Sequence, residues 1–524
     1  MKQTMRQHSF TSCLKSLAVV FGIALAFASC ANEDVPQNPT KSNGDNDKNL
    51  TTFVTGGETR TSMDYNSGNF YWGAGDYIYV KDDDGVLRKS NNAPTSKVAY
   101  FNYKVPGKFT DHSSYKVYYL GKNSSGNSVT ISTAQSQTAP DNTAHFGTAG
   151  DYGTATATGA VGGGVFSFQL EHHPAYLVFQ PYTSNTILRN CYLIKVEVTS
   201  DNDIAETYRV NTSTGALTGS EGRNQIILTT NGSSSYPNGF PLTNNSASVT
   251  TNGVYMVIKP GTHTLRVRYW VQDVTTRMDG TITKTYPSTA YASNTYYDMT
   301  ADLDVNYDGD HYYMWDAQEQ YWKGYEWTKK LPGNTGQPTL NNTSSSNYAQ
   351  SNTDSRYYHE GGGSGRFDAT QSCATLPNAN ELSWYVVYGD PRWDADELWT
   401  TMGHLYKGRM WFKKKSVLLA EHHYDTEKSA DGSTDLRTIW KHYGNNSVNS
   451  DLPSAADAGN YFSLPALGYY DSGQLNDVRS RGYYWSSSAY PWNNNDAYYL
   501  YFGSSFVGVG SSFRYYGYRV GGFE

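Results

Sequence analysis

The last segment of the chain, residues 481–524, concentrates side chains suited to non-covalent recognition. It holds nine Tyr, four Phe, two Trp, seven Ser and seven Gly, and it contains no Lys. Tyr offers a large amphipathic contact area with few torsions to freeze, and Ser and Gly adapt to a partner, which is why antibody loops favour them. Leu500, Phe502 and Val507 are the expected inward positions. The predicted ligand-binding residues are Tyr490, Trp492, Tyr499, Tyr501, Gly503, Ser504, Phe506, Gly508, Gly510, Ser511, Ser512, Phe513, Tyr515, Tyr516 and Tyr518.

Residue patterns typical of catalysis are weak by comparison. The chain has no His-Glu-x-x-His pair, no Walker loop and no Gly-x-Ser-x-Gly elbow. The pairs His172-His173 and His422-His423 would point to opposite faces of a strand, which disfavours a shared metal. A hydrolase with paired carboxylates stays open, because the separation that such a pair needs is spatial. We therefore expect no enzyme activity, no catalytic residue and no cofactor.

One acidic segment is spaced like the front of a calcium loop. At the twelfth place, where such a loop requires an acidic side chain, the sequence has Trp315. A hydrated turn between domains is therefore the favoured interpretation, and no metal site is predicted. The segment comprises Asp304, Asn306, Asp308, Gly309 and Asp310.

The composition favours strands and several domains. The 524 residues include 46 Tyr and 49 Gly, types that favour strands and turns. The formal charge of -7 lacks the basic excess that nucleic-acid binding requires. Cys191 and Cys373 are far apart in the sequence and are predicted to be buried thiols rather than a disulfide.

The first thirty residues have the pattern of an export signal. Lys2, Arg6 and Lys15 precede an apolar run, residues 17–28, that is too short for a permanent membrane span. The sequence Ala28-Ser29-Cys30 resembles a bacterial lipobox, which implies lipidation of Cys30. The acidic residues after it resemble the export signal of Bacteroidetes surface lipoproteins, so the expected location is the outer surface of the outer membrane. Residues 31–50 are expected to be a flexible tether.

The middle of the chain alternates apolar and polar residues, as half-buried strands do. Continuous apolar stretches at 175–179 and 254–258 predict central strands, and Lys259-Pro260-Gly261 predicts a turn. A Gly-rich run at 159–164 suggests a break, which predicts two β-sandwiches, 51–165 and 166–305. The alternating positions expected to face inward are Tyr192, Ile194, Val196 and Val198, and Leu265, Val267, Tyr269 and Val271.

Short motifs follow one another in a fixed order through this region. They are Thr59-Arg60-Thr61, Phe70-Tyr71-Trp72, Gly75-Asp76, Ile78, residues 170–175, residues 255–261 and residues 296–303. As an ordered set they resemble the fimbrillin family, the subunits of Bacteroidetes type V pili. The resemblance implies that proteolysis after an arginine, here Arg60, removes the first strand, and that a strand from a stalk or adaptor subunit fills the slot. An ordinary strand arginine remains the alternative for Arg60.

Residues 306–524 change character and predict an α+β domain. Asn378 or Asn380 can cap a helix that ends at Gly389, and its apolar residues fall on adjacent turns. Asp394 can cap a second helix that ends at Gly408. The apolar stripe of this second helix would be Leu398, Met402 and Leu405.

The same region contains a series of short landmarks. In order, they are Leu376-Pro377, residues 462–469, Gly482-Tyr483-Tyr484-Trp485-Ser486-Ser487-Ser488, Ala497-Tyr498 and Tyr518-Arg519-Val520. This arrangement resembles the C-type lectin-like fold, in particular the Fibrobacter major paralogous domain. The calcium-dependent sugar site of true C-type lectins does not follow, because their Glu-Pro-Asn type triplet and cysteines are absent.

Residues 499–518 contain only Tyr, Leu, Phe, Gly, Ser, Val and Arg. This restriction resembles the variable region of proteins diversified by retroelements, with ordinary drift of a lectin-like domain as the alternative.

The predicted fold is mainly β, with two fimbrillin-type β-sandwich domains followed by an α+β C-type lectin-like domain. The predicted function is that of a pilus tip adhesin, which accepts a strand from a stalk subunit and binds a host or bacterial surface glycan or protein. Residues 518–520 are expected to close the adhesin domain rather than to serve as a donor strand. A surface lipoprotein that captures glycans and is never polymerised is the alternative.

Overall fold

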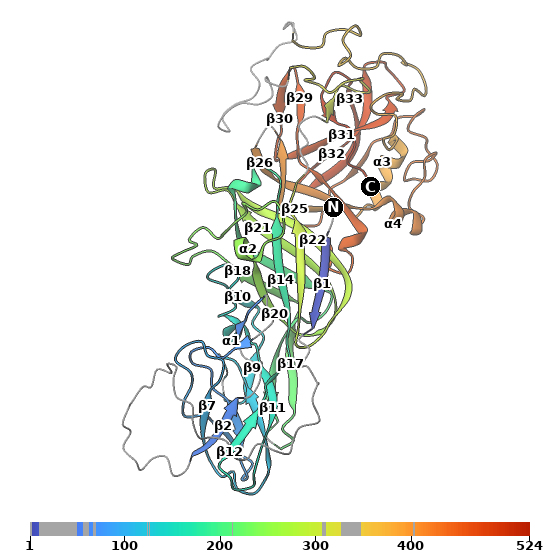
Figure 1. Cartoon of the computed structure of the whole chain (residues 1–524). Coiled ribbons are helices and arrows are strands. Elements are labelled where there is room, and N and C mark those ends of the chain that lie inside the picture. The colour runs from blue at the N-terminus through green and yellow to red at the C-terminus, as the bar shows by residue number, and fades with distance from the viewer. Residues whose placement is uncertain are drawn as a thin grey trace.

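The computed structural model describes residues 3–9, 50–55, 62–65, 70–122, 124, 126–211, 213–305, 311–325, 347–401 and 404–524. The fold is mainly β, as predicted. Figure 1 shows an elongated molecule with the first sheet at the lower end and the C-terminal sheet at the upper end. The signal and tether segments, apart from 3–9 and Leu50, lie outside the described residues, as do Cys30 and Arg60.

The first sheet is built around strand β2, Leu50–Thr55. β2 lies between β12, with which it pairs in parallel, and β7, with which it pairs antiparallel. Phe53 of β2 is fully buried, and its ring centroid lies 5.2 Å from that of Phe109 and 5.4 Å from that of Phe166. β2 therefore contributes an anchor to this core. The sheet order is β6 (Leu87–Lys89), β5 (Tyr79–Lys81), β8 (Ser114–Tyr119), β11 (Gly153–Gly159), β12 (Val165–Phe168), β2 and β7 (Asn102–Pro106), with β13 (Glu171–His172) paired to β11.

The Gly-rich run at 159–164 is a hairpin turn rather than a domain break. It joins β11 to β12 within one sheet, and Gly162 and Gly164 adopt φ of 68° and 70°, which an L side chain rarely takes. Two strands within the predicted first sandwich pair with strands from the predicted second one. β9 (Ser128–Thr130) pairs with β16 (Ala205–Val210), and β10 (Ala134–Ser136) pairs with β18 (Gln225–Thr229). A boundary at 165 therefore divides strands that are paired.

The middle of the molecule packs two sheets face to face. The smaller sheet has the order β1 (Gln3–Ser9), β23 (Thr295–Asp302), β14 (Ala175–Tyr182) and β20 (Val254–Ile258). The larger runs β10, β18 (Gln225–Thr229), β15 (Tyr192–Ser200), β21 (Gly261–Gln272), β22 (Asp279–Tyr291), β25 (Arg392–Thr401), β26 (His404–Lys413) and β28 (Tyr461–Pro465), with β19 (Phe240–Pro241) beside β15.

Most of the predicted core positions here are confirmed. The residues of β14 from Ala175 to Phe179 and those of β20 are buried, although β20 ends its sheet, and Leu265, Val267, Tyr269 and Val271 are fully buried. In β15 the prediction was wrong for Tyr192 and Ile194, which are half-buried. The pairing register with β21 shifts between Leu193 and Lys195, so the inward face changes phase and Leu193 takes the core position.

The first predicted helix is confirmed and the second is wrong. Helix α3, Ala379–Tyr388, begins at a capping box between Asn378 and Glu381 and ends at Gly389. Residues 394–401 and 404–408 instead lie in the paired strands β25 and β26, and Met402 of the predicted stripe lies outside the described residues. Leu398 packs into the core of the sandwich and Trp399 into that of the C-terminal region, so both faces of β25 are covered.

The C-terminal sheet has the order β24 (Tyr312–Tyr313), β34 (Tyr518–Arg519), β31 (Arg481–Ala489), β32 (Asp496–Gly503), β33 (Phe506–Phe513) and β27 (Tyr443–Asn445). The Trp-Ser-Ser-Ser run connects β31 to the start of α3 through two hydrogen bonds. Ser488 Oγ accepts one from the Ala379 amide at 3.1 Å, and the Ser487 amide donates the other to the Pro377 carbonyl at 3.1 Å. Residues 518–519 are held in their own sheet, as expected.

Short elements complete the fold. They are β3 (Ser62–Met63), β4 (Phe70–Tyr71), α1 (Phe146–Ala149), a 3-10 turn (Leu188–Asn190), β16 (Ala205–Val210), β17 (Leu217–Arg223), α2 (Val249–Asn252), α4 (Lys415–Ala420), a 3-10 turn (Ala458–Asn460), β29 (Tyr469–Asp471) and β30 (Gln474–Asn476). The paired segments include β3 with β4 and β29 with β30.

Candidate recognition surface

One face of the C-terminal sheet carries a group of half-buried aromatic rings. The opposite face holds Leu500, Phe502 and Val507, which are at most 1% exposed, so the predicted inward positions are confirmed. Strand alternation then places the odd-numbered residues of β32 on the other side. We call the half-buried rings the tyrosine face, and its members are Tyr469, Tyr499, Tyr501, Phe506 and Tyr516.

Two glycines form the floor beneath these rings. Gly508 pairs with Tyr501, and Gly510 pairs with Tyr499. A Cβ atom on Gly508 would lie 2.7 Å from the ring of Tyr501, and one on Gly510 would lie 3.4 Å from the rings of Tyr499 and Tyr501. The missing side chains therefore let the rings lie across β33. Gly508 and Gly503 are buried, so they support the surface rather than contact a ligand.

The rings form two groups in contact, which the buried ring of Tyr518 connects. Ring centroids lie 5.4 Å apart for Tyr499 and Tyr501, 5.9 Å for Tyr501 and Phe506, and 5.4 Å for Tyr469 and Tyr516. The centroid of Tyr518 lies 4.9 Å from that of Tyr499 and 5.6 Å from that of Tyr469. Aromatic pairs at such distances stabilise each other beyond the area they bury. The side chains are therefore held in place before any ligand arrives.

The other predicted ligand residues differ in exposure. Tyr518 is wrong as a contact residue, because it is 2% exposed and stacks on Trp485 with centroids 4.3 Å apart. Trp492 and Phe513 are 61% and 44% exposed. Ser504 is exposed, and the half-buried members are Tyr490, Gly510, Ser511, Ser512 and Tyr515.

Buried polar residues that no sequence motif indicated support this surface. Asp316, which is fully buried, accepts hydrogen bonds from the amides of Thr370, Gln371 and Cys373 at 2.7–3.0 Å. His359 Nδ1 lies 2.8 Å from the same carboxylate. Asp316 therefore fixes the segment 359–373 beside the sheet.

Arg514 fastens the same segment from the other side. Its guanidinium donates to the carbonyls of Asp496, His359 and Gly361 at 2.8–3.0 Å and lies 4.5 Å from the ring centroid of Trp315. The side chain is fully buried, and burial lowers its pKa to about 10. Arg514 is therefore a buried anchor within the segment 499–518.

The tyrosine face makes stability sensitive to alkali. Burial raises the pKa of Tyr499 to about 12, above the value of about 10 in an unfolded chain. The neutral phenol thus stabilises the fold fully below pH 10, and this contribution is lost as the pH rises through 12. We expect ionisation of Tyr499 in the unfolded chain to lower the free energy of unfolding by about 1 kcal/mol at pH 11 relative to pH 8. Urea unfolding at both pH values would measure it, and an unchanged pH dependence in Tyr499→Phe would contradict the prediction.

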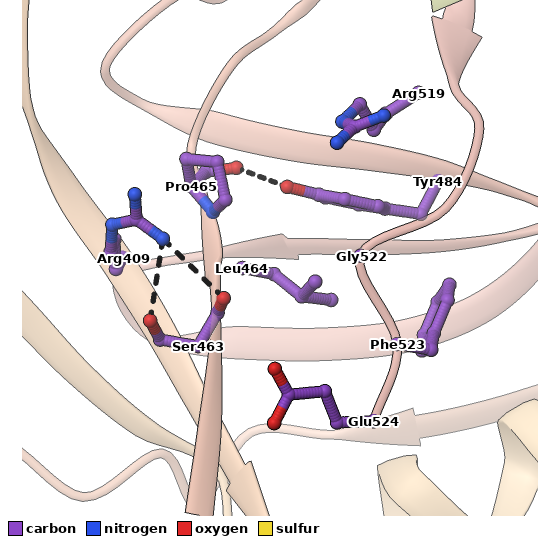
Figure 2. A pocket seen from close by; sticks show the side chains of 9 residues that line it. All are labelled: Arg409, Ser463, Leu464, Pro465, Tyr484, Arg519, Gly522, Phe523 and Glu524. Carbon is purple, nitrogen blue, oxygen red and sulfur yellow. Dashed lines mark hydrogen bonds between the residues drawn. The ribbon is translucent and has the colours of Figure 1, made fainter. Parts of the chain in front are cut away.

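A hollow of about 200 Å³ lies on the opposite side of β31 from the tyrosine face. Figure 2 shows that its polar groups bond to its own wall: Tyr484 Oη donates to the Pro465 carbonyl at 2.7 Å, and Arg409 donates to Ser463 at 3.4 and 3.5 Å. The Glu524 carboxylate also lies 3.5 Å from Lys414 Nζ. These internal bonds make the hollow a weaker candidate than the aromatic surface.

The described residues offer no cluster of three or more His, Cys, Asp or Glu side chains that could hold a metal ion. Asp304 is already engaged, because it accepts hydrogen bonds from Thr183, Ser184 and Asn185, whereas residues 306–310 lie outside the described part. Cys191 and Cys373 are buried free thiols, as predicted. Burial raises the pKa of both thiols, to about 12 for Cys191.

The two histidine pairs do different things. His172 is buried, with Nδ1 3.0 Å from Asp151, whereas His173 faces the other way and lies 2.7 Å from the hydroxyl of Thr154. The strand prediction was wrong for His422 and His423, which follow α4 in a turn. In the part of the chain that the structure covers, no helix has the length and hydropathy to cross a bilayer.

Comparisons with known proteins give faint matches only. No family model matches, and no curated protein matches. Similar solved structures include a candidate cell adhesion protein from Bacteroides ovatus, at 13% identity, 49% coverage of this chain, 93% of that chain and a TM-score of 0.29. The fimbrial anchor protein Mfa2 from Porphyromonas gingivalis matches at 10% identity, with 46% of this chain and 83% of that chain covered and a TM-score of 0.21. A fimbrial protein from Bacteroides ovatus matches at 13% identity, with 90% of this chain and 98% of that chain covered and a TM-score of 0.23. Scores of this size do not establish a shared fold or function.

Proposed function

We propose that this chain is the adhesive tip subunit of a type V pilus and that it binds a surface ligand through the tyrosine face. The observation that carries the proposal is the array of half-buried rings on a flat glycine floor. Partly exposed aromatic groups of this kind usually mark binding sites. The sheet that carries this surface lies at the end of the molecule away from the first sheet (Figure 1).

The arrangement of the first residues supports assembly by strand exchange. All the described residues ahead of Arg60 belong to β1 or β2, and each of these strands is added to a sheet formed by later residues. Cleavage after Arg60 would release β2 and leave β12 and β7 with unpaired backbone groups and the Phe53 pocket empty. Such a slot accepts an extended strand from another subunit.

The remaining parts of the proposal follow the sequence resemblances. Residues 306–524 would form the lectin-like adhesin domain, and Cys30 would carry the lipid before processing. In this proposal the tyrosine face is also the part that a retroelement would diversify, because its rings in β32 and β33 sit on a scaffold whose other face is buried. The chain would act without catalysis or a cofactor.

The proposal is tested in cells that express the wild type, Arg60→Ala and Tyr501→Ala/Tyr516→Ala. We expect Arg60→Ala to leave the chain unprocessed and absent from sheared pili, because β2 still fills its slot. We expect the double variant to enter pili normally but to lose adherence by about 10-fold or more. Tyr100→Ala, which changes a 65% exposed ring outside the C-terminal region, is the matched control.

Two outcomes would contradict the proposal. A mature N-terminus other than Thr61, together with absence of the wild type from sheared pili, would favour the non-polymerised surface lipoprotein that captures glycans. Adherence of the double variant equal to that of Tyr100→Ala would remove the tyrosine face from the function.

A further inference from the structure

Two tryptophans from distant segments stand exposed beside each other at the edge of the C-terminal sheet. Trp440 precedes β27 and is 41% exposed, and Trp492 lies in the turn between β31 and β32 and is 61% exposed. Their ring centroids are 6.2 Å apart, and their planes meet at 48°. Tyr490 lies 5.9 Å from Trp492. We call Trp440, Trp492 and Tyr490 the indole platform.

Folding alone does not account for this exposure. A Trp side chain can bury about 150–250 Å², and here two of them leave much of that area in water. Ile439, next to Trp440, is also 58% exposed, so the apolar area is continuous along the chain. Exposed apolar patches with a polar rim mark interaction sites.

The rim of the platform is polar but carries its charges in pairs. Lys441, which follows Trp440, has its Nζ 2.7 Å from Asp431. Arg366 borders the Trp492 turn, because the Gly365 amide donates to the Pro491 carbonyl, and its Nε lies 2.7 Å from Asp368. The turn itself continues with three asparagines, of which Asn494 and Asn495 are exposed. The platform therefore suits an uncharged ligand that exchanges hydrogen bonds.

We propose that the indole platform binds a neutral hexopyranose unit of a surface glycan, which names a ligand class for the adhesive function proposed above and rests on it. One face of a pyranose ring presents C–H groups whose hydrogens carry partial positive charge. These pack against the negative π face of an indole ring. The sugar packs across the exposed faces of the two tilted rings, which contact each other with centroids 6.2 Å apart, and the amides of Asn494 and Asn495 bond to its hydroxyls.

The test measures binding of the full chain to neutral hexose polysaccharides, namely a glucan, a mannan and a galactan, with hyaluronan and polygalacturonate as acidic counterparts. Affinity gel electrophoresis and quenching of tryptophan fluorescence give the dissociation constants. We expect at least one neutral polymer to bind and both acidic ones to fail. Trp440→Ala and Trp492→Ala should each weaken binding about 10-fold, and Trp440→Phe and Trp492→Phe should restore most of it.

The controls keep the outcomes separate. Tyr100→Ala is expected to bind like the wild type, and circular dichroism must show that each variant is folded. The inference would be overturned if no neutral polymer bound, or if both Ala variants bound with the affinity of the wild type. It would also be overturned if, on an array, the Ala variants lost binding to a protein ligand and to no glycan. One outcome would overturn this inference and leave the proposed function standing. In it, adherence of cells falls in the Tyr501→Ala/Tyr516→Ala variant, while the Trp440→Ala and Trp492→Ala variants adhere like the wild type.

Discussion

Replacing Arg268 with methionine is expected to lower the free energy of unfolding by about 3–5 kcal/mol. Arg268 of β21 is 7% exposed, and its Nη2 donates to Asp394 at 2.8 Å and to the Thr281 hydroxyl at 2.7 Å. Thr281 in turn donates to Glu397 at 2.8 Å. Burial, with Asp394 nearby, already raises the pKa of Glu397. Removal of the cation takes from Asp394 the guanidinium that bonds to it and lowers the positive charge near Glu397.

Chemical denaturation followed by tryptophan fluorescence measures the change. Arg209→Met, at an exposed position of β16, is the control and should change stability by about 0.5 kcal/mol or less. Arg268→Met combined with Asp394→Asn and Glu397→Gln should recover part of the loss, because the uncompensated charges are gone. Equal stability of Arg268→Met and Arg209→Met would show that the buried pair is not needed.

Arg514→Met is expected to lower the free energy of unfolding by about 3 kcal/mol, since the carbonyls of His359, Gly361 and Asp496 would each lose a hydrogen bond from a buried guanidinium. The same change frees residues 359–361 from the sheet edge, so the near-ultraviolet circular dichroism of the surrounding Trp and Tyr rings should weaken. The free energy from urea unfolding and the near-ultraviolet spectrum together measure the effect.

The matched control for Arg514 is Arg366→Met in the same region. Arg366 is exposed and its ion pair with Asp368 lies at the surface, where such pairs contribute about 0–1 kcal/mol. If both variants unfold at the same urea concentration as the wild type, Arg514 does not hold the segment in place.

Local signals in the sequence were sufficient for some elements. Helix α3 was predicted from a cap at Asn378 or Asn380 and from Gly389 at its end, and the structure places the cap at Asn378. The inward positions Leu500 and Phe502 followed from alternation within one strand. Such patterns are readable because each depends on neighbours in the chain.

The failed predictions depend on tertiary contacts. The spacing of Leu398 and Leu405 fits a helix, yet both side chains pack in the sandwich core from two strands of a hairpin. Because β25 is covered on both faces, it lacks the polar alternation that identifies a half-buried strand. The Gly-rich run at 159–164 was similarly ambiguous, since a tight turn and a linker have the same composition.

The sequence was sufficient to predict the aromatic composition of the candidate surface, but not the long-range contacts that hold it in place. Arg514 bonds to His359 across 155 positions, and Trp440 meets Trp492 from a separate segment. No periodicity encodes such pairs. The same holds for the floor beneath Tyr499 and Tyr501, which requires the register between β32 and β33.

The pairing of β22 with β25 joins the sandwich to the C-terminal region through one continuous sheet. A freely jointed molecule would have to freeze a hinge each time it met its target, and that entropy would be subtracted from the affinity. In the proposed function, the sheet connection lowers this cost and presents the tyrosine face of every copy at the same angle to the sandwich. Many weak contacts could then act together, so firm attachment would not require tight binding by any single molecule.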